Sequence, residues 1–252
     1  MDAILIISAA LLPAILLFLY IWKKDPQKEP TSQLLKGVLF GALIIIPVGI
    51  VEYIIQMILF GGGEPSSLLG TTALAFLVAA VPEECFKLLA LWLLVRRNPY
   101  FDEHIDGIVY AVCVGLGFAA VENIGYLFGN SEEWVAVAIT RSLLAVPGHY
   151  AFAVIMGYYY SLYHFVERSQ TNRRNILLMP ILAHGIYDAL AMTGMVSPIV
   201  GGICFFVLIW FCIKMHKFAY KKMLVHLKND EEKSVQYSSV IEQWMHYTNY
   251  KG

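Results

Sequence analysis

Two adjacent glutamates and a lysine, Glu83, Glu84 and Lys87, interrupt an otherwise apolar stretch between about residues 68 and 95. On a helix Lys87 would reach either carboxylate, whereas the two glutamates would point about 100° apart. A charge at the centre of a bilayer costs roughly 2.5–3.5 kcal/mol on insertion scales, so such residues mark a polar cavity or a paired site. One glutamate can therefore pair with the lysine while the other activates water as a general base. The structural alternative is a buried ion pair that only holds helices together.

Two later apolar segments also carry residues suited to hydrolysis. Glu122 and Asn123 place a third carboxylate and an amide in one of them. His184 and Asp188 are four residues apart in the other. On a helix, Asp188 can bind one imidazole nitrogen and leave the other for water, substrate or metal. For Glu122 the alternative is an interhelical hydrogen bond.

Three further ionisable residues lie in apolar surroundings. His149 follows Pro147-Gly148, at the expected outer mouth of its crossing, and is as well suited to a hydrogen bond between helices as to catalysis. Arg141 either pairs with an acid of the cavity or extends to the membrane interface. Glu52 has no ionisable neighbour on its helix, and we expect it to support the site or face an interface.

These residues must be positioned by membrane helices. Hydrophobic residues make up 58% of the 252 residues and charged residues only 15%, which excludes an ordinary soluble domain. The sequence predicts an all-α, polytopic membrane protein. The apolar segments long enough to cross a bilayer are Ala3–Trp22, Leu34–Phe60, Leu68–Val95, Ile105–Phe128, His149–Phe165, Ile176–Met195 and Ile199–Ile213.

Basic residues gather in alternate loops, which gives the orientation. Apart from Lys87 and Arg141, every Lys and Arg falls on one side, and the loops around Gly61–Ser67, Asn130–Glu133 and Gly194–Pro198 have none. Because basic loops stay in the cytoplasm, we expect about seven crossings, with the N-terminus outside and the C-terminus cytoplasmic.

One segment, Trp134–Phe165, is too long for a single crossing. We expect Trp134–Val146 to lie along the outer interface or to be re-entrant, with a break at Pro147-Gly148 before the true crossing. Residues 1–218 would form one membrane domain, and residues 219–252 a polar cytoplasmic tail.

The order of these motifs resembles the PrsW family of bacterial intramembrane proteases, relatives of the CAAX prenyl protease and bacteriocin-immunity superfamily. The resemblance covers roughly residues 5–217. Lys87, Glu122 and Asp188 depart from the EExxxR, FxxxH and HxxxN motifs of the wider superfamily, which favours PrsW over a prenyl-protein protease. The matching elements are the acidic loop Asp25–Pro30, the EExxK motif Glu83–Lys87, the blocks Asp106–Tyr110 and Gly117–Asn123, Arg141, Pro147–His149, and His184–Asp188.

The resemblance implies an endopeptidase of the bacterial cytoplasmic membrane that makes the first cut in a membrane-anchored substrate such as an anti-sigma factor. Glu83 or Glu84 is the expected base. His184, oriented by Asp188, would stabilise the oxyanion or protonate the leaving amine, with Asn123 as a further donor. The expected partners are the lipid bilayer and a single-pass membrane protein as substrate. We expect no nucleic-acid partner.

Two questions stay open at the level of sequence. Because the chain has no HExxH motif, any zinc would need a dispersed ligand set such as Glu84, Glu122, His149 and His184. A glutamate mechanism without metal is equally compatible with these residues. The alternatives to a protease are a proton- or ion-coupled transporter, which the lack of inverted repeats argues against, and a non-catalytic immunity or binding protein.

The orientation can be tested by labelling single cysteines in a background without the native ones. We predict that a membrane-impermeant thiol reagent labels the loops that lack basic residues and leaves the basic loops unlabelled. The positions to use are Gly62, Ser131 and Ser197 for the first group, and Lys28, Arg96 and Arg173 for the second. External labelling at Arg173 but not at Ser131 would contradict the topology.

Overall fold

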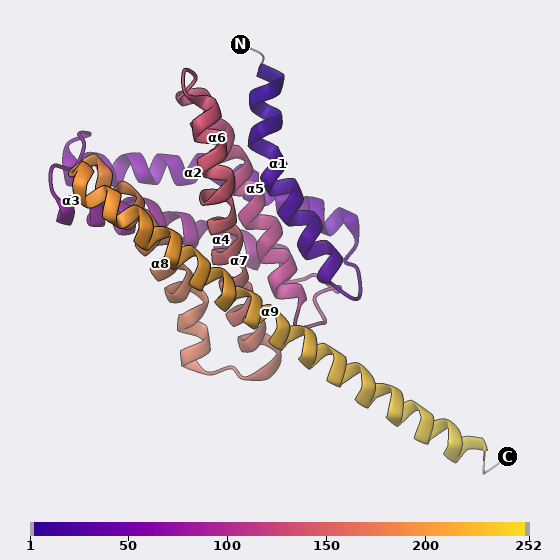
Figure 1. The fold of residues 1–252 in the computed structure, drawn as a ribbon. Helices are drawn as coiled ribbons and strands as arrows, with labels where there is room; N and C mark the ends of the chain where they lie inside the picture. The colour runs from indigo at the N-terminus through magenta and orange to yellow at the C-terminus, as the bar shows by residue number, and fades with distance from the viewer. Residues whose placement is uncertain (1–2, 250–252) are drawn as a thin grey trace.

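The protein is all-helical over the residues that the structure, a computed structural model, describes, which are residues 3–249, with side chains for residues 3–241 (Figure 1). Four short or distorted helices interrupt or extend the long ones. The elements are α1 (Ala3–Lys24), α2 (Thr31–Phe60), α3 (Leu68–Ala73), a π-helix (Leu74–Ala80), α4 (Val81–Val95), α5 (Asp106–Gly129), α6 (Trp134–Leu143), α7 (Ala145–Ser161), a second π-helix (Leu162–Val166), α8 (Gln170–Met192), a 3₁₀ turn (Thr193–Met195) and α9 (Pro198–Asn249).

Within the described residues, six helical stretches are long and apolar enough to cross a membrane, judged by length and composition. The all-α polytopic prediction is therefore confirmed. The remaining expected span, Leu68–Val95, is helical from end to end but is divided by a π-helix, so the exact number of crossings stays a prediction. The six stretches are Ala3–Lys24, Thr31–Phe60, His104–Gly129, Trp134–Val166, Gln170–Met195 and Pro198–Ile241.

Helix α5 lies at the centre, and glycines bring its neighbours into backbone contact. A Cβ added to Gly41 of α2 would lie 2.0 Å from the carbonyl oxygen of Val114, and one added to Gly117 would lie 2.1 Å from that of Val38. On the other side of α5, a Cβ at Gly157 of α7 would lie 2.3 Å from a backbone oxygen of α5. Small residues allow this close approach, which places side chains of α2, α5 and α7 within reach of one another.

The π-helix Leu74–Ala80 lies directly before the two glutamates of α4. Its wide turn is closed by the Val81 N–H, which donates to the carbonyl of Phe76 five residues earlier. Pro82 lies in the first turn of α4, and the helix is distorted just before it, in a π-turn of the kind that commonly accompanies functional sites. The ring of Phe76 fills the space beside Gly185, because a Cβ there would lie 2.3 Å from it. This contact holds α8 against the start of α4.

The break between α6 and α7 occurs at Leu144, where φ is −122° and ψ is −59°, and not at Pro147-Gly148 as expected from the sequence. Pro147 lies in the first turn of α7 instead. The first turn tolerates proline, since its backbone N–H would have no helical partner there. His149 consequently belongs to the α7 helix proper.

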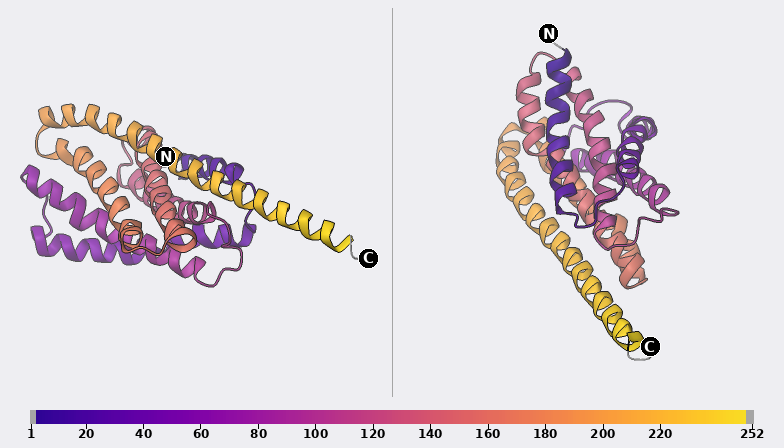
Figure 2. Two further views of the ribbon diagram at one scale, coloured as in Figure 1. Left: turned by 90° about the horizontal axis from the view of Figure 1, so that it is seen from below. Right: turned by 90° about the vertical axis from the view of Figure 1, so that its right-hand side faces the viewer.

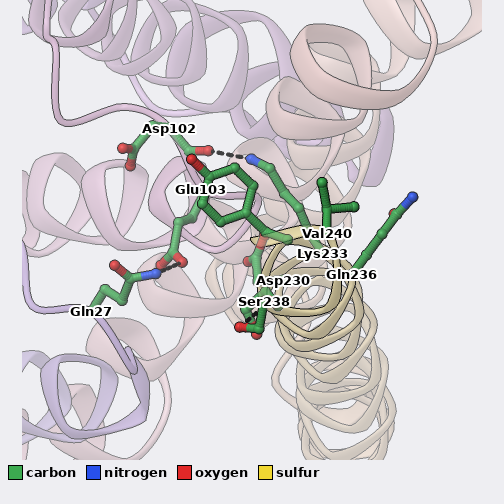
Figure 3. A pocket seen from close by; sticks show the side chains of 10 residues that line it. Gln27, Asp102, Glu103, Asp230, Lys233, Gln236, Ser238 and Val240 are labelled. Atoms are coloured by element: carbon green, nitrogen blue, oxygen red, sulfur yellow. Dashed lines mark hydrogen bonds between the residues drawn. The ribbon is translucent and has the colours of Figure 1, made fainter. Parts of the chain in front are cut away.

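Helix α9 runs across the molecule and extends well beyond the other helices, continuing without interruption through residue 218 (Figures 1 and 2). Its polar part docks on the loop before α5. The Asp230 carboxylate accepts hydrogen bonds from the backbone N–H groups of His104 and Ile105, at 2.8 and 2.9 Å. Lys233 donates to the carbonyl oxygen of Asp102 at 2.9 Å (Figure 3). The segment expected to be a polar tail is therefore helical up to Asn249; residues 250–252 lie outside the described residues.

Two motifs that are far apart in the sequence meet beside this docking site. The Tyr110 hydroxyl of α5 donates to the carboxylate of Glu29, from the acidic loop between α1 and α2. Burial raises the pKa of the Glu29 carboxyl to about 7. Gln27 of the same loop donates to Glu103 (Figure 3). These contacts fix the start of α5.

The glycine contacts predict which substitutions in α2 weaken the fold. Gly41→Ala should destabilise the protein by about 1–3 kcal/mol, because its methyl group meets backbone that cannot move away. Gly49→Ala is the matched control on the same helix, since nothing lies within 4 Å of the added Cβ. Thermal unfolding in one detergent should show a lower midpoint for Gly41→Ala only. Equal midpoints would contradict the close α2–α5 packing.

Candidate active site

The ammonium group of Lys87 lies at the centre of a buried polar network. Its Nζ is 2.8 Å from Glu83 Oε2 and 2.9 Å from Glu84 Oε1, so it contacts both carboxylates that the helical spacing put within its reach, and not only one of them. It is also 3.1 Å from Nδ1 of His149 on α7 and 4.3 Å from the centre of the Phe118 ring on α5. Three helices therefore meet at a single cation.

His184 of α8 joins the network from the opposite side. Its Nδ1 is 2.9 Å from Glu84 Oε1, and its Nε2 is 3.2 Å from Asp188 Oδ2, the contact that the sequence spacing predicted. The imidazole stacks on the Phe152 ring, with 4.6 Å between centroids and 18° between planes. Glu83 Oε2 lies 4.0 Å from Nε2. The ring is thus held in one orientation with both glutamates close by.

Glu122 of α5 connects the network to Arg141 of α6. Its Oε2 is 3.0 Å from Nε2 of His149 and also accepts a hydrogen bond from the Arg141 guanidinium. The guanidinium lies over the Tyr126 ring, 3.8 Å from its centre. Of the two roles expected for Arg141, the structure shows the pairing with an acid.

Asn123 occupies a different place from the one expected. Its side-chain amide donates to the carbonyl oxygen of Ala10 in α1 at 2.9 Å, and its oxygen accepts from Arg141 Nε at 2.8 Å. Asn123 has no exposed surface and does not line the cavity, so it holds Arg141 in place and does not present a donor to the cavity.

His149 lies deeper than the outer mouth at which the sequence placed it. It is only 4% exposed, and its ring centroid is 5.4 Å from that of His184. The reason is that α7 begins at Ala145 and packs closely on α5: a Cβ on Gly115 would lie 2.8 Å from the Cβ of Ala153. His149 therefore bridges Lys87 and Glu122 in the interior.

A cavity of about 600 Å³ opens beside this network. Glu83 lines the cavity, whereas Glu84 is fully buried behind it, a distinction that adjacent residues in a sequence do not reveal. Glu52 of α2 also lines the cavity, as does Glu64 from the loop after α2, which sequence reasoning did not single out. Phe152 was missed as well, because an aromatic side chain in an apolar helix carries no signal of a neighbouring imidazole.

Comparison with known proteins assigns the chain to a family. A family model described as PrsW family intramembrane metalloprotease matches residues 29–213. Protease PrsW of Geobacillus kaustophilus is 38% identical over 192 residues, covering 74% of this chain and 80% of that relative. Protease PrsW of Bacillus subtilis is 34% identical over 208 residues, covering 81% and 90%. No solved structure matches significantly.

The chain belongs to the PrsW family. The resemblance inferred from the motifs is thereby confirmed. PrsW membership makes the protein a membrane protease and speaks against the alternatives of an ion-coupled transporter and a non-catalytic immunity protein. A third relative, Protease PrsW of Clostridioides difficile, is 34% identical over 207 residues, covering 80% of this chain and 85% of that relative.

The description of the PrsW family as metalloproteases can be compared with the donors present. Glu83, His149 and His184 are all buried and offer ligand atoms within 4.8 Å of one another. This set of nitrogen and oxygen donors suits zinc. It contains both histidines of the set expected from the sequence, but Glu83 replaces Glu84 and Glu122. Those two carboxylates contact the imidazoles instead, as outer carboxylates do around metal-ligating histidines.

The donor set predicts metal binding that can be measured without any substrate. Purified protein should retain about one zinc ion per chain, and His149→Ala or His184→Ala should each lower zinc affinity by at least about 100-fold, more than loss of an outer partner costs. His164→Ala removes an exposed histidine elsewhere and should leave binding unchanged. Elemental analysis and competition with a chelating dye measure both. If the purified protein contains no metal, cleaves substrate and is not inhibited by chelator, that result would support the glutamate mechanism without metal.

Proposed function

We propose that this protein is an intramembrane endopeptidase that makes the first cut in a membrane-anchored regulatory protein such as an anti-sigma factor, using water activated at Glu83. The observation that carries the proposal is the pairing of Glu83 with a buried Lys87–His184 network at the wall of a cavity. Within the PrsW family, this arrangement supplies both a base for water and cationic donors for the developing oxyanion.

The roles follow from which side chains reach the cavity. Glu83 borders it and takes the proton of the attacking water, whereas Glu84 stays behind and holds Lys87 and His184 in position. Asp188 orients His184, which stabilises the oxyanion or protonates the leaving amine. Glu122, which Arg141 holds in place, orients His149. In the alternative with metal, Glu83, His149 and His184 would hold a zinc ion that polarises the scissile carbonyl and acidifies a bound water, and Glu83 would be a ligand and not the base.

The expected topology places this cavity on the outer side of the bacterial cytoplasmic membrane, with the N-terminus outside and the C-terminus in the cytoplasm. Its lining includes Glu64 and Met195, each from a loop without basic residues. The polar part of α9 lies on the opposite, basic side. A cut made from the outer side suits a first cleavage that precedes a second one elsewhere.

We predict that Glu83→Gln abolishes cleavage of a single-pass membrane substrate by purified, reconstituted protein, with a loss of at least about 100-fold. Glu84→Gln should also reduce cleavage strongly, because Lys87 and His184 lose their anchor. Glu133→Gln, an exposed acid outside the cavity, is the matched control. Rates are measured by gel with and without chelator, at equal protein levels. Near-normal cleavage by both Glu83→Gln and Glu84→Gln would show that the pair is structural.

A further inference from the structure

Glu52 is the acid of the cavity that the catalytic network does not use. Among the described acidic residues that line the cavity, Glu83, Glu122 and Asp188 each contact a basic side chain. Glu52 has neither a hydrogen bond nor an ion pair within the described part of the chain, and the same is true of Glu64 nearer the mouth. The carboxyl groups of Glu52 and Glu64 therefore line the cavity without a basic partner among the described residues.

The position of Glu52 on α2 directs its carboxylate into this space. Ile45, Glu52 and Gln56 line the cavity and are separated by seven and four residues, so they share one face of the helix. Polar side chains continue along this wall, from Glu52 through Gln56 to Glu64. The wall faces the catalytic groups contributed by α4, α7 and α8.

Glu52 is displaced from the catalytic carboxylate toward one end of the cavity. It lies eight residues before the end of α2, roughly 12 Å along the helix axis. Glu83 lies fifteen residues beyond Leu68, the first residue of α3, or roughly 22 Å along that helical stretch. Measured along the helices, Glu52 therefore lies closer than Glu83 to the loop Gly61–Ser67.

An ionisable group in a membrane segment is costly, and such groups commonly pair with an opposite charge. A basic group of the substrate could provide that charge for Glu52. A substrate helix that enters the cavity must unwind around its scissile bond, and the freed polar groups need partners inside the membrane. We propose that Glu52 determines substrate specificity by binding a lysine or arginine of the substrate, located between the scissile bond and the membrane surface at the Gly61–Ser67 end. This inference rests on the proposed protease function and names a feature of its substrate.

Binding of synthetic single-pass peptides to the full chain carrying Glu83→Gln tests the proposal without requiring cleavage. The probes share one leucine-rich transmembrane segment with a glycine-containing centre, and carry Lys, Met or Glu a few residues toward the outer end. The Lys probe should bind about tenfold or more tightly than the Met probe, as measured by fluorescence anisotropy in nanodiscs. Adding Glu52→Gln should remove this preference, and Glu52→Lys should transfer it to the Glu probe. Glu133→Gln should leave the preference unchanged.

Thermal stability separates a substrate-binding role from a structural one. A carboxylate without an internal partner should cost stability, so Glu52→Gln should unfold at the same temperature as the wild type or higher. A lower unfolding temperature, or a Lys preference that persists in Glu52→Gln, would overturn the proposal.

The binding test also distinguishes the inference from the proposed function. Wild-type protein that cuts no membrane substrate, while the Lys probe still binds through Glu52, would contradict the protease proposal alone. Wild-type protein that cuts Lys and Met substrates at equal rates, and does so equally well with Glu52→Gln, would contradict the specificity proposal alone.

Discussion

Charges buried among membrane helices must be paired, because removing an ion from water costs several kcal/mol even after the surroundings relax. The Lys87 ammonium group is paired with two carboxylates of its own helix, α4, and contacts one imidazole of α7. Glu84 extends the pairing to His184 of α8, and His149 extends it to Glu122 of α5. Loss of any one partner would leave another charge uncompensated, so the network specifies the relative positions of these helices as well as the chemistry.

The network can form because the backbone allows the helices to approach closely. Gly41 and Gly117 place α2 against α5, while Gly157 does the same for α7. The π-helix before α4 then brings Phe76 against Gly185, one residue after His184. Close approach of small residues replaces the hydrophobic driving force that is missing between helices in lipid. The cavity lies between α2 on one wall and α4, α5, α7 and α8 on the others, and α6 supplies Arg141 to its lining.

The ends of the helices show why some predictions from the sequence were confirmed and others were wrong. Helix ends at Lys24, Phe60 and Val95 lie within two residues of the predicted ends of the apolar segments, because a segment that crosses a bilayer must be helical over its apolar length. The α6–α7 break was placed three residues too late, because proline is a helix breaker in the interior and is accepted in a first turn. The expected placement of His149 at the outer mouth depended on that same boundary.

The sequence by itself determined that this protein is an all-α membrane protein and, through the EExxK, FxxxE and HxxxD motifs, that it resembles PrsW proteases. Spacing along one helix was enough to predict that Lys87 can reach either glutamate and that His184 contacts Asp188. Only the tertiary structure decided which glutamate faces the cavity and that Glu52 shares its wall. The physical reason is that helical periodicity relates residues within one segment, whereas the rotation and approach of different helices depend on packing at glycines and on long-range charge pairing.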